Sequence, residues 1–257
     1  MVLVYLLKFS NMLKLITLNI EMNKHYQRFL PFLDEEAPDV VCLQEAPESA
    51  LSYLRERGFV TVFAPMIIKE LNGVQEKVGV VLATKLPFST QKVYYHGVEE
   101  KLALSNGKDD AKISAFVYLL ADIEFGNTSY QIATTHMADT NDGHEDDFQI
   151  MVMNKLLSSL SKEGSHCLCG DLNMPRGFNT LYDDVTKIYH DAIPVHYQSS
   201  LDKNLHKSGN KKLDQPIFDC YMVDYVFTQF PYEAKVEKMQ FGVSDHAGVV
   251  AYIGKLA

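Results

Sequence analysis

The sequence predicts a layered fold of the α/β or α+β class, in which strands outnumber helices. Short apolar runs typical of strands recur along the chain, whereas helical periodicity is clear in fewer segments. With 257 residues, of which 47% are hydrophobic, and no Pro/Gly/Ser-rich linker, the chain can bury one sizeable core. Strands are predicted at residues 13–19, 39–44, 59–64, 78–84, 113–123, 130–136, 166–170, 222–228 and 248–253, and helices at 24–37, 47–57 and 145–162.

The first strands each end on a polar residue that can bind a metal or carry a proton. The strand at 13–19 ends at Asn19, and Glu21 follows two residues later. The next strand stops on Glu45, and the strand at 130–136 ends in His136. Because side chains alternate along an extended segment, residues two apart face the same side. These positions are therefore candidates for one polar site.

The later strands repeat this pattern. The apolar run at 166–170 is followed by Asp171 and Asn173, two residues apart. Asp224 interrupts the apolar strand at 222–228, and Asp245 and His246 precede the last strand. An acid that can take a proton, beside an amide that can donate to an anion, suits attack on a phosphate ester. One such strand end is usually only a turn, but a series of them favours a site.

The acidic run before the third helix has a structural interpretation. Acidic side chains at the start of a helix stabilise its dipole. A second interpretation is that the run steers a cationic or choline-like substrate. The run consists of Asp139, Asp142, Glu145, Asp146 and Asp147.

Taken in order, Leu-Asn, Leu-Gln-Glu, Thr-His, Gly-Asp-Leu-Asn, Asp-Tyr-Val-Phe and Ser-Asp-His resemble the endonuclease/exonuclease/phosphatase superfamily, the deoxyribonuclease I-like metal-dependent phosphoesterases. The resemblance extends from about residue 13 to 252. It implies a four-layer α/β/β/α sandwich, two packed mixed β-sheets flanked by helices, with the site at one sheet edge. It also implies a divalent cofactor, Mg²⁺ or Mn²⁺, bound by oxygen ligands.

The resemblance assigns a role to each candidate. Glu45 is the principal metal ligand, with Asn19 and Glu21 completing or supporting the site, although the family often has Asp at the position of Glu21. Asp171 orients or deprotonates the attacking water, and Asn173 donates to the nucleophile or to a phosphoryl oxygen. His246 binds the phosphate or takes the proton, and Asp245 supports His246 or contacts the metal. His136 holds the phosphate or protonates the leaving oxygen, and Asp224 fixes His136.

Other residues receive no catalytic role. Arg176 could reach a leaving-group phosphate, but a surface position is the expected one. The seven remaining histidines match no motif, and His166 belongs to a structural segment. These histidines are His25, His96, His144, His166, His190, His196 and His206.

Charge and cysteine content bear on substrate and compartment. The net charge of −9, from 33 acids against 24 bases, disfavours a nucleic-acid partner without excluding one, because such binding relies on Lys and Arg. The four cysteines form no Cys-x-x-Cys pair, and three lie in apolar strands, which favours a reducing compartment. We therefore expect a cytoplasmic monomer with a phosphoester substrate.

Residues 1–11 are predicted to be an N-terminal extension, and residues 12–257 one catalytic domain. The apolar stretch at 1–7 is about a third of the ~20 residues that a membrane helix needs, and it lacks the basic region and cleavage site of a secretory signal. No transmembrane segment is predicted.

The sequence is compatible with several functions. His136 is unlike the apurinic endonucleases and resembles the deoxyribonuclease I, sphingomyelinase, deadenylase and tyrosyl-DNA phosphodiesterase branches. The favoured function is an intracellular phosphodiesterase or nuclease. The alternatives are a phosphomonoesterase, a sphingomyelinase-like lipid phosphodiesterase and, from another class, a noncatalytic binding module that retains the fold.

Overall fold

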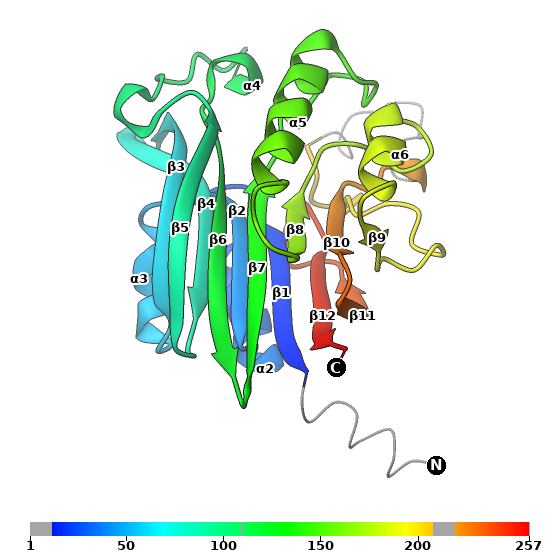
Figure 1. The fold of residues 1–257 in the computed structure, drawn as a ribbon. Coiled ribbons are helices and arrows are strands. Elements are labelled where there is room, and N and C mark those ends of the chain that lie inside the picture. The colour runs from blue at the N-terminus through cyan, green and yellow to red at the C-terminus, as the bar shows by residue number, and fades with distance from the viewer. Residues whose placement is uncertain (1–11, 109, 208–218, 257) are drawn as a thin grey trace.

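The computed structural model describes residues 12–108, 110–207 and 219–256, and the predicted extension at 1–11 lies outside them. Two six-stranded mixed sheets pack face to face (Figure 1). The first sheet has the order β11 (Tyr232–Gln240), β12 (Gly248–Lys255), β1 (Leu13–Asn19), β2 (Val40–Pro47), β4 (Val74–Thr84), β3 (Val60–Leu71). The second has the order β5 (Phe88–His96), β6 (Phe116–Phe125), β7 (Thr128–His136), β8 (Cys167–Asp171), β10 (Asp224–Thr228), β9 (His190–Asp191).

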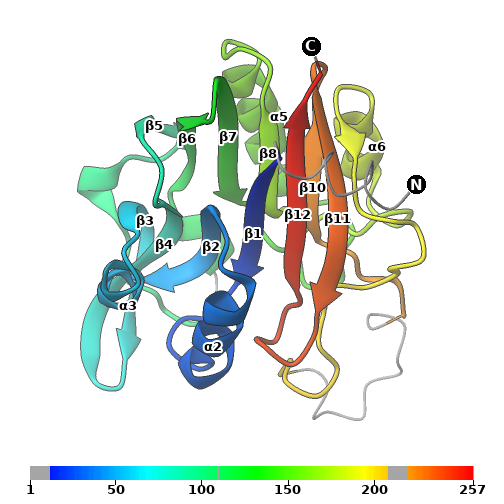
Figure 2. The ribbon, with the colours of Figure 1, turned by 90° about the horizontal axis from the view of Figure 1, so that it is seen from below.

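Helices cover the outer faces of both sheets, which gives the four layers that the resemblance implies. Helices α2 (Tyr26–Glu36) and α3 (Ala50–Glu56) lie against the first sheet, and α5 (Asp147–Leu160) and α6 (Thr180–Thr186) lie on the side of the second (Figures 1 and 2). Two short helical segments, η1 (Glu99–Lys101) and α4 (Asp110–Ile113), lie between β5 and β6 in the chain.

Alternation along β1 and β2 builds two cores, one on each face of the first sheet. Leu15 and Cys42 belong to the cluster that fills the space between the sheets. Their neighbours Ile16 and Leu43 pack with Phe29 of α2 in a second cluster. Fully burying one such side chain contributes about 1.5–3 kcal/mol, so these contacts fix the strand ends that carry the polar residues.

Strand register places those polar residues beside one another. Strands β7 and β8 are parallel and pair His136 with Asp171, and β8 and β10 are antiparallel and pair Asp171 with Asp224. In the first sheet β1 and β2 are parallel and pair Asn19 with Gln44, the residue before Glu45. The polar strand ends of both sheets therefore meet at one edge.

Every predicted strand and helix corresponds to an element of the structure, but two long strands were not predicted. Strand β5 is an edge strand with four consecutive exposed residues, 89–92, and β11 is an edge strand with alternating charged residues. Edge strands carry polar side chains that discourage pairing with other chains, so their apolar signal is weak. The short elements β9, α4, α6 and η1 were also missed.

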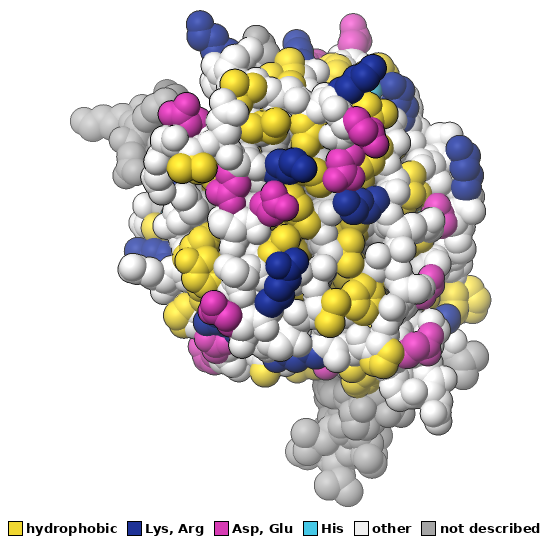
Figure 3. All heavy atoms as spheres, turned by 90° about the vertical axis from the view of Figure 1, so that its left-hand side faces the viewer, with side chains coloured by type: hydrophobic (Ala, Val, Ile, Leu, Met, Phe, Trp, Pro, Cys, Tyr) yellow, Lys and Arg dark blue, Asp and Glu magenta, His cyan; other side chains and the backbone are white. Residues whose placement is uncertain are grey.

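The distribution of charged side chains and the character of the helices are relevant to possible binding partners. Lys/Arg and Asp/Glu side chains are interspersed over the described residues of the face that carries the edge strands β3 and β5 (Figure 3). In the ranges that the structure describes, no helix is long and apolar enough to span a membrane.

Candidate active site

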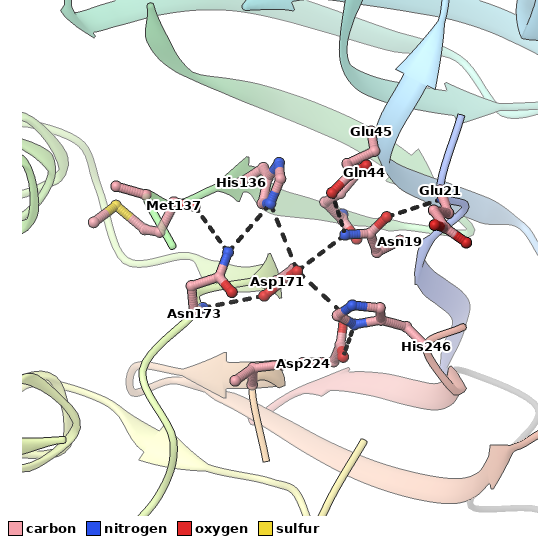
Figure 4. Close-up of polar contacts among 12 residues, drawn as sticks. Asn19, Glu21, Gln44, Glu45, His136, Met137, Asp171, Asn173, Asp224 and His246 are labelled. Atoms are coloured by element: carbon pink, nitrogen blue, oxygen red, sulfur yellow. Dashed lines mark hydrogen bonds and ion pairs between the residues drawn. The ribbon is translucent and has the colours of Figure 1, made fainter. Parts of the chain in front are cut away.

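The structure brings the nine predicted site residues to one edge of the two sheets. Figure 4 labels all of them except Asp245. Seven of them line a cavity of about 780 Å³, and Asn19 and Asp224 lie just behind its wall. The seven are Glu21, Glu45, His136, Asp171, Asn173, Asp245 and His246.

Unusual backbone conformations aim several of these side chains. Glu21, Glu45 and Asn173 have positive φ angles of 45°, 49° and 48°, a region that costs a non-glycine residue about 1–2 kcal/mol. At Glu45 the pairing of β2 with β4 shifts register, and such a bulge redirects a side chain. Gly170 has φ 138°, and a Cβ there would lie 2.1 Å from the carbonyl oxygen of Thr135. Only glycine therefore lets β8 approach β7 closely enough to present the next residue.

Asp171 lies at the centre of the site. Its Oδ2 accepts a hydrogen bond of 3.0 Å from the Asn19 amide, and it is 3.6 Å from His136 Nε2 and 3.8 Å from His246 Nδ1. Its Oδ1 accepts a 3.1 Å bond from the backbone N–H of Asn173. Burial raises the pKa of Asp171 to about 6, against the lowering effect of the His246 charge, and the Asp224 charge adds to the rise. Asp171 is thus a carboxylate whose pKa lies near neutrality.

Asp224 pairs with His246, and the expectation that it fixes His136 is wrong. Asp224 Oδ2 is 2.7 Å from His246 Nδ1. Strand β8 lies between β7 and β10, so Asp171 separates Asp224 from His136 by two strand spacings, about 9.5 Å. Burial alone would lower the pKa of His246, but the charges of Asp224 and Asp171 raise it well above its ordinary value. His246 is therefore cationic at neutral pH.

The loops after β7 and β8 are tied together on the other side of Asp171. The Asn173 amide donates a 3.0 Å bond to the carbonyl of Met137 and lies 3.3 Å from His136 Nε2. From α5, the fully buried Gln149 donates to the carbonyls of Ala138 and Asn173, at 2.7 and 2.8 Å. Gln149 thus positions both loops, although sequence reasoning gave it no role.

Oxygen atoms that could bind a metal gather on the first-sheet side of the cavity. The Asn19 amide donates to Glu45 at 3.3 Å, and its carbonyl accepts from the backbone N–H of Glu21 at 3.1 Å. Burial raises the pKa of Asp245 to about 7; the His246 charge opposes the rise, and the charges of Glu21 and Glu45 add to it. Carboxylates that repel one another in this way fit a divalent cation, which prefers oxygen ligands and would compensate their charge.

Sequence reasoning missed two histidines of the site. His25 Nε2 is 3.0 Å from Glu21 Oε2, and Glu21, His25 and Asp245 offer ligand atoms within 4.8 Å of one another. The ring centroids of His206 and His246 are 6.4 Å apart, and His206 lines the cavity. Burial and then the His246 charge lower the pKa of His206 to about 4. The four-residue spacing of Glu21 and His25 was a usable signal, whereas His206 had none.

Three other expectations can be compared with the structure. Arg176 is neither a surface residue nor a phosphate ligand here, because it is half-buried, 3.0 Å from Asp191, and donates to the carbonyl of Ile193. The acidic run does begin a helix, because Asp146 caps α5 by accepting from the N–H of Gln149. His166 is fully buried and structural, as expected.

A two-sheet sandwich that gathers carboxylates, amides and imidazoles at one edge of its sheets is the arrangement of a phosphoester hydrolase. Residues 16–246 match the model of the Endonuclease/Exonuclease/phosphatase family. The chain therefore belongs to that family, whose members hydrolyse phosphoester bonds. No curated protein sequence matches the chain.

Solved structures of family members share the fold at low sequence identity. An endonuclease/exonuclease/phosphatase family protein from Leptotrichia buccalis is 16% identical, with a TM-score of 0.69 over 94% of this chain and 99% of that one. The human Nocturnin catalytic domain with bound sulfate anion is 14% identical, with a TM-score of 0.64 over 96% and 95%. D. rerio TDP2 complexed with single strand DNA product is 15% identical, with a TM-score of 0.63 over 95% and 99%.

Proposed function

We propose that the chain is a divalent-metal-dependent phosphodiesterase of the cytoplasm in which Asp171 and His246 serve the attack of a water molecule. The observation that carries this proposal is the position of Asp171. Its Oδ2 lies 3.0 Å from the Asn19 amide, 3.6 Å from His136 and 3.8 Å from His246. A carboxylate in such a setting, with a pKa of about 6, suits proton abstraction near neutral pH.

Each group then has a definite task. Asp171 takes the proton of the attacking water. His246, kept cationic by Asp224, donates from its other ring nitrogen to a phosphoryl oxygen on which negative charge builds. His136 and Asn173 bind the phosphate from the opposite side, where His136 can protonate the leaving oxygen.

Four residues would hold the divalent ion, Mg²⁺ or Mn²⁺: Asn19, Glu21, Glu45 and Asp245. Burial raises the pKa of Glu45, but the charges of His136 and Lys69 outweigh burial, so this pKa lies below its ordinary value. Glu45 is therefore an ionised ligand at neutral pH. Bound there, the ion would supply positive charge to the phosphoryl oxygens and lower the pKa of a bound water.

The cavity favours a compact substrate. Its volume of about 780 Å³ lies within the range of small-molecule sites, roughly 300–1,000 Å³. Lysines and acids both line it, so it is better suited to a single phosphate group than to a long polyanion. The net charge of −9 also disfavours a long polyanion. The lysines are Lys24, Lys69, Lys108, Lys112 and Lys207, and the acids include Asp139, Asp142, Glu145 and Asp146.

A substrate screen tests the proposal. We expect hydrolysis of bis(p-nitrophenyl) phosphate in Mg²⁺ or Mn²⁺, loss of it in chelator, and loss of it in Asp171→Asn. Asp191→Asn is the matched control, because Asp191 is a half-buried acid paired with Arg176 outside the cavity. The screen includes p-nitrophenyl phosphate, p-nitrophenylphosphorylcholine and short single-stranded DNA, the last because the TDP2 structure holds such a product.

The outcomes separate the candidate functions. Preference for the monoester favours a phosphomonoesterase, and preference for the choline ester favours a lipid phosphodiesterase. If no ester is hydrolysed with any ion, the chain is a noncatalytic binding module and the proposal is wrong.

A further inference from the structure

We propose that His25 is a nitrogen ligand of the metal site, together with Glu21 and Asp245, and that this nitrogen makes the site prefer Mn²⁺ to Mg²⁺. The inference rests on the divalent-ion site of the proposed function, for which either Mg²⁺ or Mn²⁺ was given, and it names the ion.

The three ligand atoms have the spacing that one ion needs. The Nε2 atom of His25 is 3.0 Å from Oε2 of Glu21, and the atoms of all three residues lie within 4.8 Å of one another. Ligands about 2.1 Å from an ion are at most about 4.2 Å apart, so a movement of about 0.6 Å brings the widest pair into range. Glu21, His25 and Asp245 are 8%, 9% and 5% exposed, so little side-chain entropy remains to be lost on binding.

The fold holds His25 in place, and the hydrogen bond of its imidazole within the described residues is to Glu21. His25 is the residue before α2, but its imidazole makes no capping hydrogen bond. Positive φ angles at Glu21 and Met22, 45° and 62°, turn the chain back so that the imidazole meets the Glu21 carboxylate. Phe29 and Leu33 anchor α2 on the first sheet. The imidazole is thus aimed at Glu21 by the backbone.

Asp245 is fixed independently from the other side of the site. Its backbone carbonyl accepts a 2.7 Å bond from the N–H of Asp202. The backbone N–H of Ala247 donates to the carbonyl of Ser200 at 2.8 Å. The loop before β12 is therefore tied to the segment at 200–202, and Asp245 faces Glu21 from a rigid support.

Ligand chemistry then decides the ion. Mg²⁺ takes almost only oxygen ligands and keeps several of its waters, whereas Mn²⁺, which also favours oxygen, is a softer transition-metal ion and accepts a neutral imidazole more readily. Exchanging one oxygen ligand for imidazole nitrogen therefore strengthens Mn²⁺ binding relative to Mg²⁺. The Nε2 atom would bind an ion through its lone pair, so any proton on this nitrogen would leave to solvent when the ion binds.

Lys24 supplies an independent variant. Its ammonium forms an ion pair with Glu21, so it competes with a bound ion for this carboxylate. Lys24→Met removes the competitor and should tighten the binding of both ions about equally. A gain of affinity cannot come from misfolding, so this variant complements one in which a ligand is removed.

The experiment measures metal binding to the full chain without substrate. Calorimetric titrations with Mn²⁺ and Mg²⁺ are compared for wild type, His25→Gln and Lys24→Met. The Gln amide can still donate to Glu21 but offers no imidazole nitrogen. His144→Gln is the matched control, because His144 lines the same cavity and packs its ring against Phe178, and it is not one of the three proposed ligands.

We expect wild type to bind Mn²⁺ at least tenfold more tightly than Mg²⁺. His25→Gln should reduce this ratio about tenfold, and Lys24→Met and His144→Gln should leave it unchanged. Pulsed electron paramagnetic resonance of bound Mn²⁺ should show ¹⁴N modulation in wild type and lose it in His25→Gln.

Three results would overturn the inference: absence of ¹⁴N modulation in wild type, equal weakening of both ions in His25→Gln, or no binding of either ion to wild type. Equal weakening would mean that His25 only orients Glu21. Failure of the proposed function gives a different pattern, in which Mn²⁺ binds with a nitrogen ligand but no phosphoester is hydrolysed.

Discussion

Replacing Asp224 by Asn tests the pairing that the structure assigns to the cationic histidine. Asp224 is fully buried, and its Oδ2 lies 2.7 Å from Nδ1 of His246. Asn has nearly the same shape but no charge, so the change removes the electrostatic contribution and preserves the packing. Asp224 touches no substrate in this proposal and acts by positioning and charging His246.

The magnitude follows from the hydrogen bond that is lost. A hydrogen bond to a charged group contributes about 1.5–3 kcal/mol, and each 1.36 kcal/mol corresponds to a factor of ten in rate. We therefore expect kcat to fall by roughly 10- to 100-fold, with a smaller change in KM. Asp224 Oδ1 is buried and has no hydrogen-bond partner among the described residues, so the Asn amide placed there should also cost about 1–3 kcal/mol of stability.

The pH–rate profile should move in a defined direction. Activity rises with pH as Asp171 ionises near its pKa of about 6, which the Asp224 charge helps to raise. It falls at high pH as His246 loses the proton that Asp224 helps to hold. Removing the Asp224 charge lowers both pKa values, so both limbs should shift to lower pH.

Steady-state kinetics with an activated diester, and an NMR titration of the His246 ring, measure these effects. Asp191→Asn is the control for loss of a half-buried carboxylate outside the site. A folded Asp224→Asn variant with wild-type kcat and an unmoved pH profile would refute the assignment.

Four further predictions concern single groups. Glu45→Gln should weaken Mg²⁺ binding in a folded protein, because a neutral amide replaces an anionic ligand; an unchanged Mg²⁺ titration would contradict its assignment. His246→Ala and Asp171→Asn should each lower turnover roughly 10²-fold or more, and the double variant should lose little beyond the worse single one in the same assay. His166→Ala should reduce stability more than turnover. Burial lowers the pKa of His166 below its ordinary 6.5, so below pH 6.5 the unfolded chain binds more protons than the folded protein. In urea denaturation, the stability of wild type should therefore decrease more steeply than that of the variant as the pH is lowered from 6.5. Gln149→Leu removes the hydrogen bonds to the two loops but touches no proposed metal ligand, so it should lower kcat about tenfold without changing the dissociation constant for Mn²⁺. An unchanged kcat would show that the loops keep their positions without Gln149.

The sequence alone determined the buried strands and the polar residues that end them. Buried strands such as 13–19 and 166–170 carry their signal locally, because most side chains that pack between the sheets are apolar. A polar residue at such a strand end stands out from its neighbours, which is why Asn19, Asp171 and His246 could be identified. Their order along the chain then supplied the resemblance to the family.

Only the tertiary structure decided which of these residues meet. The pairing of Asp224 with His246 depends on the order of strands in the second sheet, and sheet order leaves no local trace in the sequence. The approach of His25 to Asp245 joins segments 220 residues apart through the packing of α2 and the loop before β12. Contacts of this kind form only when distant segments pack around a shared core, so they depend on residues throughout the fold.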